Sequence, residues 1–246
     1  MYENDSAAEV YDLLYQDRKD YAGEAARITE LIRERTPDAA GLLDVACGTG
    51  THLEAFAKLY DRVSGLELSE WMAARAEERL PGVTVHLGDM RSFDLGETYD
   101  AVVCMFSSIG YLETAADLED AVAAMARHLT ADGVLAVEPW YFPDTFLDGH
   151  VSTHALRTEP GDRGVARVSH STREGGRTRM EIHYLIAHTV EGIRHRSEVD
   201  YLTLFSRAQY ETAYRKAGLA VEYVETGGGS PGFFLGTRGS RADTRG

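Results

Sequence analysis

The chain has 246 residues, and its 40 Asp and Glu against 25 Lys and Arg give a formal net charge of −15. Nonspecific nucleic-acid binding and docking on anionic lipid both need basic surfaces, so this charge argues against both classes of partner. The first residues carry two acids and no apolar signal region, and no stretch approaches the roughly 18 to 20 apolar residues of a membrane span. We therefore expect a cytoplasmic protein with one large domain, or one domain carrying an insertion.

Strands and helices alternate along the first half of the chain. The predicted helices begin at Glu24, at His52, after the N-cap candidate Ser69 and after Thr114, where Asp117 completes a capping-box variant. Short apolar runs predict strands at 41–45, 63–67, 83–87, 101–106 and 134–137. This order predicts an α/β fold with a doubly wound, mostly parallel, Rossmann-like sheet.

Beyond Pro139 the hydrophobic period changes to two. Residues 180–186 alternate between apolar and polar side chains, and 165–172 and 193–204 are predicted partner strands. Three consecutive strands predict an antiparallel β-meander inserted into the parallel core. Thereafter Ser206 and Gln209 predict a helix, followed by strands at 220–225 and 233–236.

The predicted organisation therefore has four parts. They are a core with an N-terminal lid (1–150), the antiparallel insertion (151–205), the return helix with the last core strands (206–238) and a flexible tail (239–246).

A glycine turn after the first strand indicates a cofactor site. Asp44 ends that strand, Gly48 and Gly50 follow it, and Glu67 ends the second strand. Glycines at such a turn let a ligand approach the backbone, and an acid ending the second strand can accept both ribose hydroxyls of an adenosine. NAD, FAD and S-adenosylmethionine all bind in such a crevice.

Three details favour S-adenosylmethionine. Leu53 occupies the place of the third glycine of a dinucleotide fingerprint. Asp44 would repel a pyrophosphate, but it suits a ligand that bears an ammonium and a sulfonium. Asp89 and Met90 end the third strand, where they can contact an adenine ring.

The sequence resembles class I S-adenosylmethionine-dependent methyltransferases. It is most similar to the sugar N,N-dimethyltransferases that act on TDP-3-amino-3,6-dideoxy- and 3,4,6-trideoxyhexoses in desosamine and mycaminose pathways. The likeness spans residues 2 to about 236. The segments that carry it are Val10-Tyr11-Asp12-Leu13, Lys19-Asp20-Tyr21, Leu42 to Gly50, Gly65-Leu66-Glu67-Leu68-Ser69, Gly88-Asp89-Met90-Arg91, Met105-Phe106-Ser107-Ser108-Ile109-Gly110-Tyr111, Glu138-Pro139-Trp140 and Arg167-Val168-Ser169-His170-Ser171.

This resemblance, with the glycine turn, implies a set of site residues. The expected cofactor-binding residues are Tyr11, Tyr21, Asp44, Ala46, Gly48, Gly50, Glu67, Leu68, Asp89, Met90 and Met105. The expected substrate-binding residues are Tyr2, Ser108, Tyr111, Trp140, Ser169, His170 and Arg179. Tyr2 and Tyr111 are the expected catalytic pair, and the tyrosine-rich N-terminal arm would act as a lid that dries the site.

The chemistry implied is an in-line methyl transfer to a neutral amine, which depends mainly on positioning and on excluding water. A tyrosine with a pKa near 10 would orient the amine rather than deprotonate it at neutral pH. The arginines around His170 suit thymine and diphosphate oxygens. The histidines lack the spacing or acidic partners of a metal site, so we expect no metal.

Two positions depart from the family pattern. Tyr141 stands where relatives commonly carry a second tryptophan, and Pro231 stands where they carry an arginine that can meet the diphosphate. Either another arginine substitutes, or the carrier differs.

The leading hypothesis is an N-methyltransferase that adds one or two methyls to the 3-amino group of a TDP-linked amino-deoxyhexose in antibiotic deoxysugar biosynthesis. The alternatives are methylation of another small amine or hydroxyl, such as glycine or a polyketide phenol, and a catalytically idle adenosyl-binding module. The resemblance also implies a homodimer.

Overall fold

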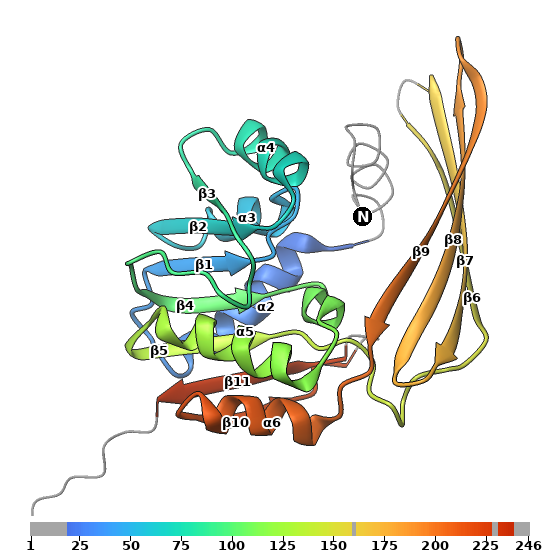
Figure 1. Cartoon of the computed structure of the whole chain (residues 1–246). Helices are drawn as coiled ribbons and strands as arrows, with labels where there is room; N and C mark the ends of the chain where they lie inside the picture. Colours follow the sequence, from blue (N-terminus) through green and yellow to red (C-terminus); the bar gives the residue numbers. More distant parts are fainter. Residues whose placement is uncertain (1–18, 159–160, 228–230, 239–246) are drawn as a thin grey trace, which may run out of the picture.

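The computed structural model describes residues 19–158, 161–227 and 231–238, and these form two β-sheets. The larger sheet has seven strands in the order β10-β11-β5-β4-β1-β2-β3, and the smaller has four in the order β6-β7-β8-β9 (Figure 1). The helices are α2 (Tyr21–Arg33), α3 (Thr51–Phe56), α4 (Glu70–Arg79), α5 (Ala115–Arg127) and α6 (Arg207–Lys216), with a 3-10 turn η1 (Ser108–Tyr111). The expected N-terminal lid with Tyr2 and Tyr11, and the expected tail, lie outside the described residues.

The seven-stranded sheet confirms the predicted fold class. Its strands are β1 (Gly41–Val45), β2 (Arg62–Glu67), β3 (Thr84–Leu87), β4 (Tyr99–Cys104), β5 (Leu129–Val137), β10 (Leu219–Val224) and β11 (Phe233–Arg238). The first five pair in parallel, whereas β11 is antiparallel to both β5 and β10. The strand order reverses between β1 and β4, so a crevice is expected outside the carboxyl ends of these two strands.

Local sequence signals set the helix starts. Thr114 with Asp117 and Ser206 with Gln209 form reciprocal capping boxes at α5 and α6, and Ser69 accepts a hydrogen bond from the backbone N–H of Met72 at α4. The helix predicted from His52 was expected to run to Leu59, and that end was wrong, because α3 stops at Phe56. There the Lys58 N–H bonds three residues back to Ala55, which tightens the last turn.

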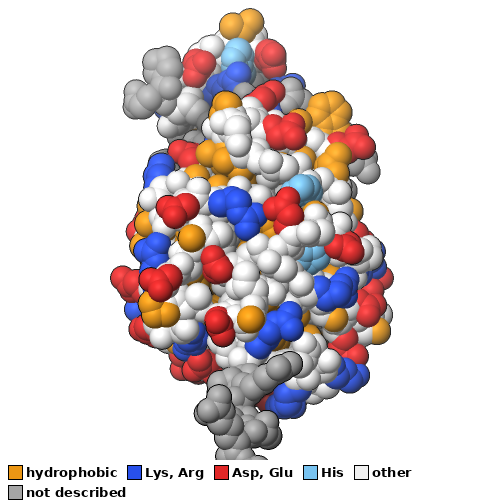
Figure 2. Space-filling view, turned by 90° about the vertical axis from the view of Figure 1, so that its left-hand side faces the viewer, with side chains coloured by type: hydrophobic (Ala, Val, Ile, Leu, Met, Phe, Trp, Pro, Cys, Tyr) orange, Lys and Arg blue, Asp and Glu red, His pale blue; other side chains and the backbone are white. Residues whose placement is uncertain are grey.

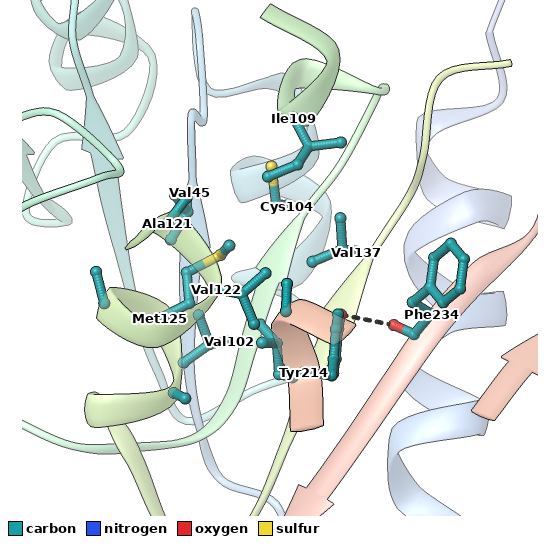
Figure 3. Close-up of a cluster of buried hydrophobic side chains, with 14 of the residues drawn as sticks. Val45, Val102, Cys104, Ile109, Ala121, Val122, Met125, Val137, Tyr214 and Phe234 are labelled. Atoms are coloured by element: carbon teal, nitrogen blue, oxygen red, sulfur yellow. Dashed lines mark hydrogen bonds between the residues drawn. The ribbon is translucent and has the colours of Figure 1, made fainter. Parts of the chain in front are cut away.

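The core packs on both faces of the large sheet. On the face of α5 and α6, the fully buried Tyr214 donates a hydrogen bond from its hydroxyl to the Phe234 carbonyl at 3.1 Å (Figure 3). Gly236 of the same strand fits only because it lacks a side chain, since a Cβ there would lie 2.4 Å from the Tyr214 ring. A second buried cluster beneath α2 and α3 covers the opposite face.

The smaller sheet corrects the predicted insertion, because it has four antiparallel strands instead of three. They are β6 (His150–Arg157), β7 (Arg163–Glu174), β8 (Arg177–His188) and β9 (Gly192–Thr203). The strand that sequence reasoning missed is β6, an edge strand whose residues are all at least partly exposed. It pairs through its backbone and carries little of the apolar alternation by which a strand is recognised.

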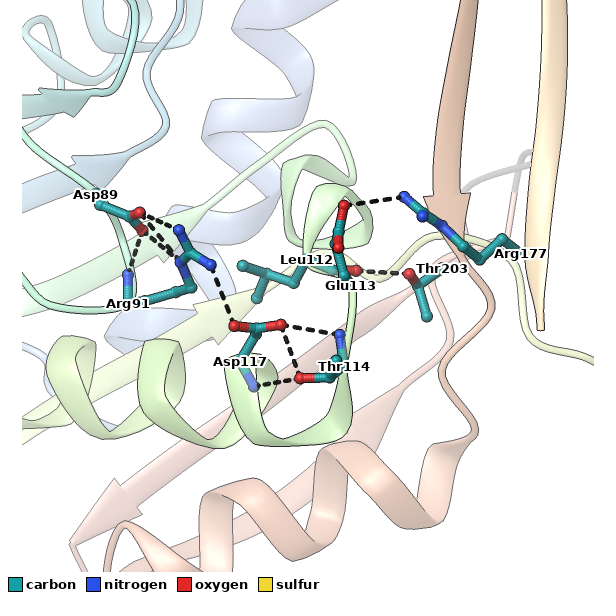
Figure 4. Close-up of polar contacts among 8 residues, drawn as sticks. All are labelled: Asp89, Arg91, Leu112, Glu113, Thr114, Asp117, Arg177 and Thr203. Carbon is teal, nitrogen blue, oxygen red and sulfur yellow. Dashed lines mark hydrogen bonds and ion pairs between the residues drawn. The ribbon is translucent and has the colours of Figure 1, made fainter.

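Polar contacts next to η1 help to tie the smaller sheet to the core. The Thr203 hydroxyl at the end of β9 donates to the Leu112 carbonyl at 2.6 Å, and Arg177 of β8 lies 3.8 Å from the Glu113 carboxylate (Figure 4). Leu112 and Glu113 directly follow η1. The position of η1 is therefore fixed from both sheets.

The side of the core that faces away from the smaller sheet carries basic and acidic side chains interspersed with one another (Figure 2). Within the described ranges, no helix is long and apolar enough to cross a membrane.

Candidate active site

A cavity of about 620 Å³ lies at the carboxyl ends of β1, β2 and β4, where the fold predicts it. We call it the strand-end cavity. Eight of the predicted cofactor-binding residues line it: Tyr21, Asp44, Ala46, Gly48, Glu67, Leu68, Met90 and Met105. The structure thus brings together residues from five different segments of the sequence.

The turn after β1 forms the floor of this cavity. Ala46, Gly48 and Gly50 all have positive φ values, at 59°, 58° and 81°. Gly50 does not line the cavity. It begins α3, and a Cβ there would lie 3.0 Å from the Ala76 Cβ of α4, so its role is to let two helices approach.

Glu67 is fixed at the end of β2 by backbone hydrogen bonds. Its carboxylate accepts from the N–H of Gly48 at 2.9 Å and from the N–H of Ser69 at 2.8 Å. Burial raises the pKa of this carboxyl group, and the two N–H donors oppose the rise. A third backbone hydrogen bond, from Leu68, also favours the ionised carboxylate. Because a carboxylate has about four lone-pair sites, Glu67 can still accept a hydrogen bond from a ribose hydroxyl.

Asp44 is the feature that best tests the fit of a cationic ligand. It is 1% exposed, and neither carboxylate oxygen has a hydrogen-bond partner among the described residues. Burial, together with the nearby charge of Glu67, raises its pKa to about 8. A buried carboxylate without a partner is costly, and an ammonium or sulfonium placed beside it would remove that cost. S-Adenosylmethionine carries both groups, so the site fits it.

A recess of about 220 Å³, lined by Leu66, Asp89 and Met90 among others, adjoins the strand-end cavity. The Asp89 carboxylate accepts from Arg91 at 2.5 and 3.0 Å, and Arg91 in turn reaches Asp117 at the start of α5 (Figure 4). The side-chain hydrogen bond from Arg91 lowers the pKa of Asp89. Asp89 is therefore a fixed, ionised acceptor beside an apolar recess, as the adenine expectation requires.

A second cavity, of about 510 Å³, lies between the two sheets, and we call it the inter-sheet cavity. Four of the predicted substrate-binding residues line it: Ser108, Tyr111, Trp140 and Ser169. Phe106, Ser108 and Tyr111 line both cavities. Tyr111 thus stands where a group leaving the first cavity would enter the second.

The loop that carries Tyr111 is held in an unfavourable backbone conformation. Phe106 and Ser107, neither of them glycine, have φ values of 55° and 57°. The Glu138 carboxylate accepts from the Phe106 N–H at 2.6 Å, and the Ser107 hydroxyl donates to the Pro139 carbonyl at 2.8 Å. These bonds from the end of β5 hold η1 at the junction of the cavities.

His170 and Arg179 are not brought to the inter-sheet cavity of this chain. Strand β7 alternates, so Arg167, Ser169 and Ser171 point inward while His170 lies on the outer, exposed face. Arg179 lies on the outer face of β8, where it binds Glu181 at 3.0 Å. Each of these two residues is the sequence neighbour of positions whose side chains point inward.

Two charged cavity residues, Lys19 and Asp200, were absent from the predicted site, and Arg167 was considered only as one of the arginines around His170. Lys19 lies with its ammonium 3.8 Å from the Phe106 ring centre, Arg167 is 4% exposed, and Asp200 of β9 is 5% exposed. Asp200 left a signal in the sequence. Asp200 lies two residues before Leu202, so both side chains point to the same face of β9. That face pairs with the inward-facing residues of β8, which are mostly apolar. A carboxylate at an inward position of this kind indicates a polar function.

A doubly wound sheet with an adenosyl-type site at its switch point, facing an acceptor cavity, defines a class I methyltransferase. In agreement, residues 42–133 match the methyltransferase domain family.

Two curated relatives and two solved structures match nearly the whole chain. It is 56% identical to the dTDP-3-amino-3,4,6-trideoxy-α-D-glucopyranose N,N-dimethyltransferase of Streptomyces venezuelae, covering 96% of this chain and 99% of that protein. It is 49% identical to the dTDP-3-amino-3,6-dideoxy-α-D-glucopyranose N,N-dimethyltransferase of Streptomyces fradiae, covering 97% and 93%. The crystal structure of Streptomyces venezuelae DesVI matches with a TM-score of 0.90 at 55% identity over 96% and 99%. The structure of CalS10, an amino pentose methyltransferase from Micromonospora echinaspora with S-adenosylmethionine bound, matches with a TM-score of 0.86 at 49% identity. The match covers 93% of this chain and 96% of that chain.

The chain therefore belongs to the family of S-adenosylmethionine-dependent TDP-amino-sugar N,N-dimethyltransferases.

Proposed function

We propose that this protein transfers one or two methyl groups from S-adenosylmethionine to the 3-amino group of a TDP-linked amino-deoxyhexose, in antibiotic deoxysugar biosynthesis. The observation that carries the proposal is the pair of adjoining cavities that share Tyr111. One has the chemistry of an adenosyl site, and the other is large enough for a sugar nucleotide. Relatives that match almost the whole chain act on such amino sugars.

Arg167 supports a diphosphate or thymine in the inter-sheet cavity. Its guanidinium is buried, donates to the Ser169 hydroxyl at 3.0 Å, and has no hydrogen-bond partner at Nε among the described residues. A desolvated guanidinium with a free donor is suited to an anionic ligand. We therefore propose that Arg167 supplies an anion-binding donor in this cavity.

The residues around the junction would act mainly by positioning and desolvation. S-Adenosylmethionine supplies a methyl group activated by a sulfonium. Asp44 and Glu67 would hold its cationic and ribose ends, and Tyr111 would orient the acceptor amine. Trp140, fixed by a 3.1 Å hydrogen bond from its indole N–H to Thr178, would form an apolar wall that excludes water.

We further propose a homodimer in the cytoplasm that acts without metal, nucleic acid or membrane. The outer face of the smaller sheet supports the dimer, because it exposes Val151, Val168, Leu185 and Ile193 at 47% or more. Light scattering of the purified protein would give the oligomeric state.

The direct test is mass spectrometry after incubation with S-adenosylmethionine and a TDP-3-amino-deoxyhexose. We expect products heavier by one and then two CH₂ groups, and inhibition of the reaction by TDP. Absence of both products with every such sugar would contradict the substrate. Turnover of another amine or a phenol without inhibition by TDP would favour a different acceptor.

A further inference from the structure

Asp200 is a buried carboxylate beside the point where the two cavities meet. It lies on β9 opposite Met180 of β8 and faces the inter-sheet cavity. Its Oδ2 accepts a hydrogen bond from the Tyr111 hydroxyl at 3.3 Å. Because Tyr111 lines both cavities, Asp200 contacts a residue at the junction that a methyl group would cross from the first cavity to the second.

Asp200 is also the one carboxylate among the described residues that line the inter-sheet cavity. The Tyr111 hydroxyl donates its proton toward Asp200, and a phenol hydroxyl is too weak a base to take a proton from an ammonium group. The imidazole of His52 faces the other cavity and is bound to Glu24 at 2.8 Å. Asp200 is hydrogen-bonded to Tyr111, so a proton released beside Tyr111 has this carboxylate as an acceptor one hydrogen bond away.

The surroundings of Asp200 adjust its basicity to this task. Burial and the charge of Glu198 raise its pKa to about 6, while the Tyr111 hydrogen bond and the charge of Arg167 on β7 oppose the rise. Glu198 in turn accepts from Tyr184 of β8 at 2.7 Å and from Arg196 at 2.9 Å. Lys19, Tyr141 and His150 are the other titratable side chains among the described residues that line the cavity. Asp200 is thus largely ionised at pH 7, yet it can take up a proton.

The reaction needs such a group. An aliphatic amine with a pKa of about 8 to 10 is mostly an ammonium at neutral pH, and an ammonium has no lone pair with which to attack a methyl group. Each methyl transfer to a neutral amine also produces a new ammonium. Dimethylation therefore requires a proton to be removed before each of the two transfers.

We propose that Asp200 binds the ammonium of the acceptor sugar and takes its proton before each methyl transfer. The inference rests on the proposed function. The N–H bond breaks and an O–H bond forms, so that R–NH₃⁺ and the carboxylate become R–NH₂ and the carboxylic acid. The lone pair then forms the N–CH₃ bond as the C–S bond breaks and its electrons return to sulfur. The carboxylic acid releases its proton to solvent when the product leaves.

Calorimetry tests the proton step without turnover. The wild-type protein and Asp200→Asn are saturated with S-adenosylhomocysteine and titrated with the TDP-amino sugar at pH 7, in two buffers of different ionisation enthalpy. In the wild type the proton moves within the complex, so we expect almost none to reach the buffer. Asp200→Asn must bind the neutral amine and should release up to about one proton, with an affinity that rises with pH.

TDP without the sugar is the control ligand, and the two proteins should bind it equally. If the wild type and Asp200→Asn release the same number of protons on binding the amino sugar, and their affinities depend on pH in the same way, the assignment of Asp200 is overturned. Failure of the wild type to bind or methylate any TDP-amino sugar would instead refute the proposed function, so the two failures are distinguishable.

Kinetics supply the second readout. At pH 7 we expect Asp200→Asn to lower kcat by roughly 10²-fold, the usual scale for one acid–base group, and the loss should shrink by pH 9 as free amine becomes abundant. Glu198→Gln is the matched variant on the same strand. It removes the charge that raises the pKa of Asp200, so the acidic limb of kcat should move to lower pH. A loss in Asp200→Asn that is equal at every pH would indicate a merely structural residue.

Discussion

At the scale of single residues, buried charge identifies the site. Asp44 and Arg167 are almost fully buried, and each has a polar atom without a hydrogen-bond partner among the described residues. They lie in different cavities and have opposite charge. A protein gains no stability from such groups alone, so each is explained by a ligand of the opposite sign.

Asp44 makes the stability of the ligand-free protein dependent on pH. Its pKa of about 8 in the folded protein exceeds the value of about 3.9 expected when unfolded. The stabilising contribution is full below about pH 4 and is lost as the pH rises toward 8. We expect Asp44→Asn to abolish this loss, so that its stability relative to the wild type grows between pH 5 and pH 8.

The difference in free energy of unfolding between Asp44→Asn and the wild type can increase by about 1.4 kcal/mol per pH unit, and urea denaturation measures it. The same variant should bind S-adenosylhomocysteine more weakly, because the ligand ammonium loses its carboxylate. A stability difference that does not change with pH would show that Asp44 is not the buried titrating group.

Arg167 should be needed for the nucleotide end of the substrate. We expect Arg167→Gln to weaken TDP binding by roughly 10- to 100-fold, the value of one charge-assisted hydrogen bond, with S-adenosylhomocysteine binding unchanged. Isothermal titration measures both. Arg194→Gln, at an exposed position of β9, is the control and should bind both ligands normally. Normal TDP binding by Arg167→Gln would contradict the assignment of an anion-binding site to Arg167 in this cavity.

At the scale of elements, the sequence predicts what short-range patterns determine. The parallel strands, the capping boxes at Thr114 and Ser206, and the meeting of Asp44 with Glu67 follow from periodicity and from the rule that parallel strands end at one edge. The edge strand β6 was missed because it buries little apolar surface. His170 was placed in the site although neighbouring residues of a strand point to opposite faces. The buried face of β7 was hard to recognise from the sequence because it carries Arg167, Ser169 and Ser171 where apolar residues would mark it.

The packing of β11 gives a stability prediction at this scale. Gly236→Ala would place a Cβ 2.4 Å from the Tyr214 ring, which is fully buried and cannot move aside freely. We expect a loss of about 1 to 3 kcal/mol in the free energy of unfolding, as in other overpacked cores, measured by urea denaturation. Gly176→Ala, at a turn with nothing within 4 Å of the added Cβ, should change it by no more than about 0.5 kcal/mol. Similar losses in both variants would contradict this view of the core.

At the scale of the whole molecule, the charge is divided between the two ligand sites. Residues 151–207 contain nine Lys and Arg against seven Asp and Glu, so a segment with a net charge of +2 belongs to a protein with −15. The acidic remainder holds the adenosyl site, whose ligand is cationic. The more basic sheet faces the cavity assigned to an anionic nucleotide. On the proposed function, we expect this division to orient the substrate with its amine toward Tyr111 and its phosphates toward Arg167.

The central claim is that the inter-sheet cavity binds the nucleotide so that the sugar amine is presented at Tyr111. The most direct test compares kcat/KM for a TDP-3-amino-deoxyhexose with kcat/KM for the same amino sugar without its nucleotide. If two or more charge-assisted contacts hold the phosphates, removal of the nucleotide should lower kcat/KM by about 10³-fold. Equal efficiency with the free amino sugar would contradict the account.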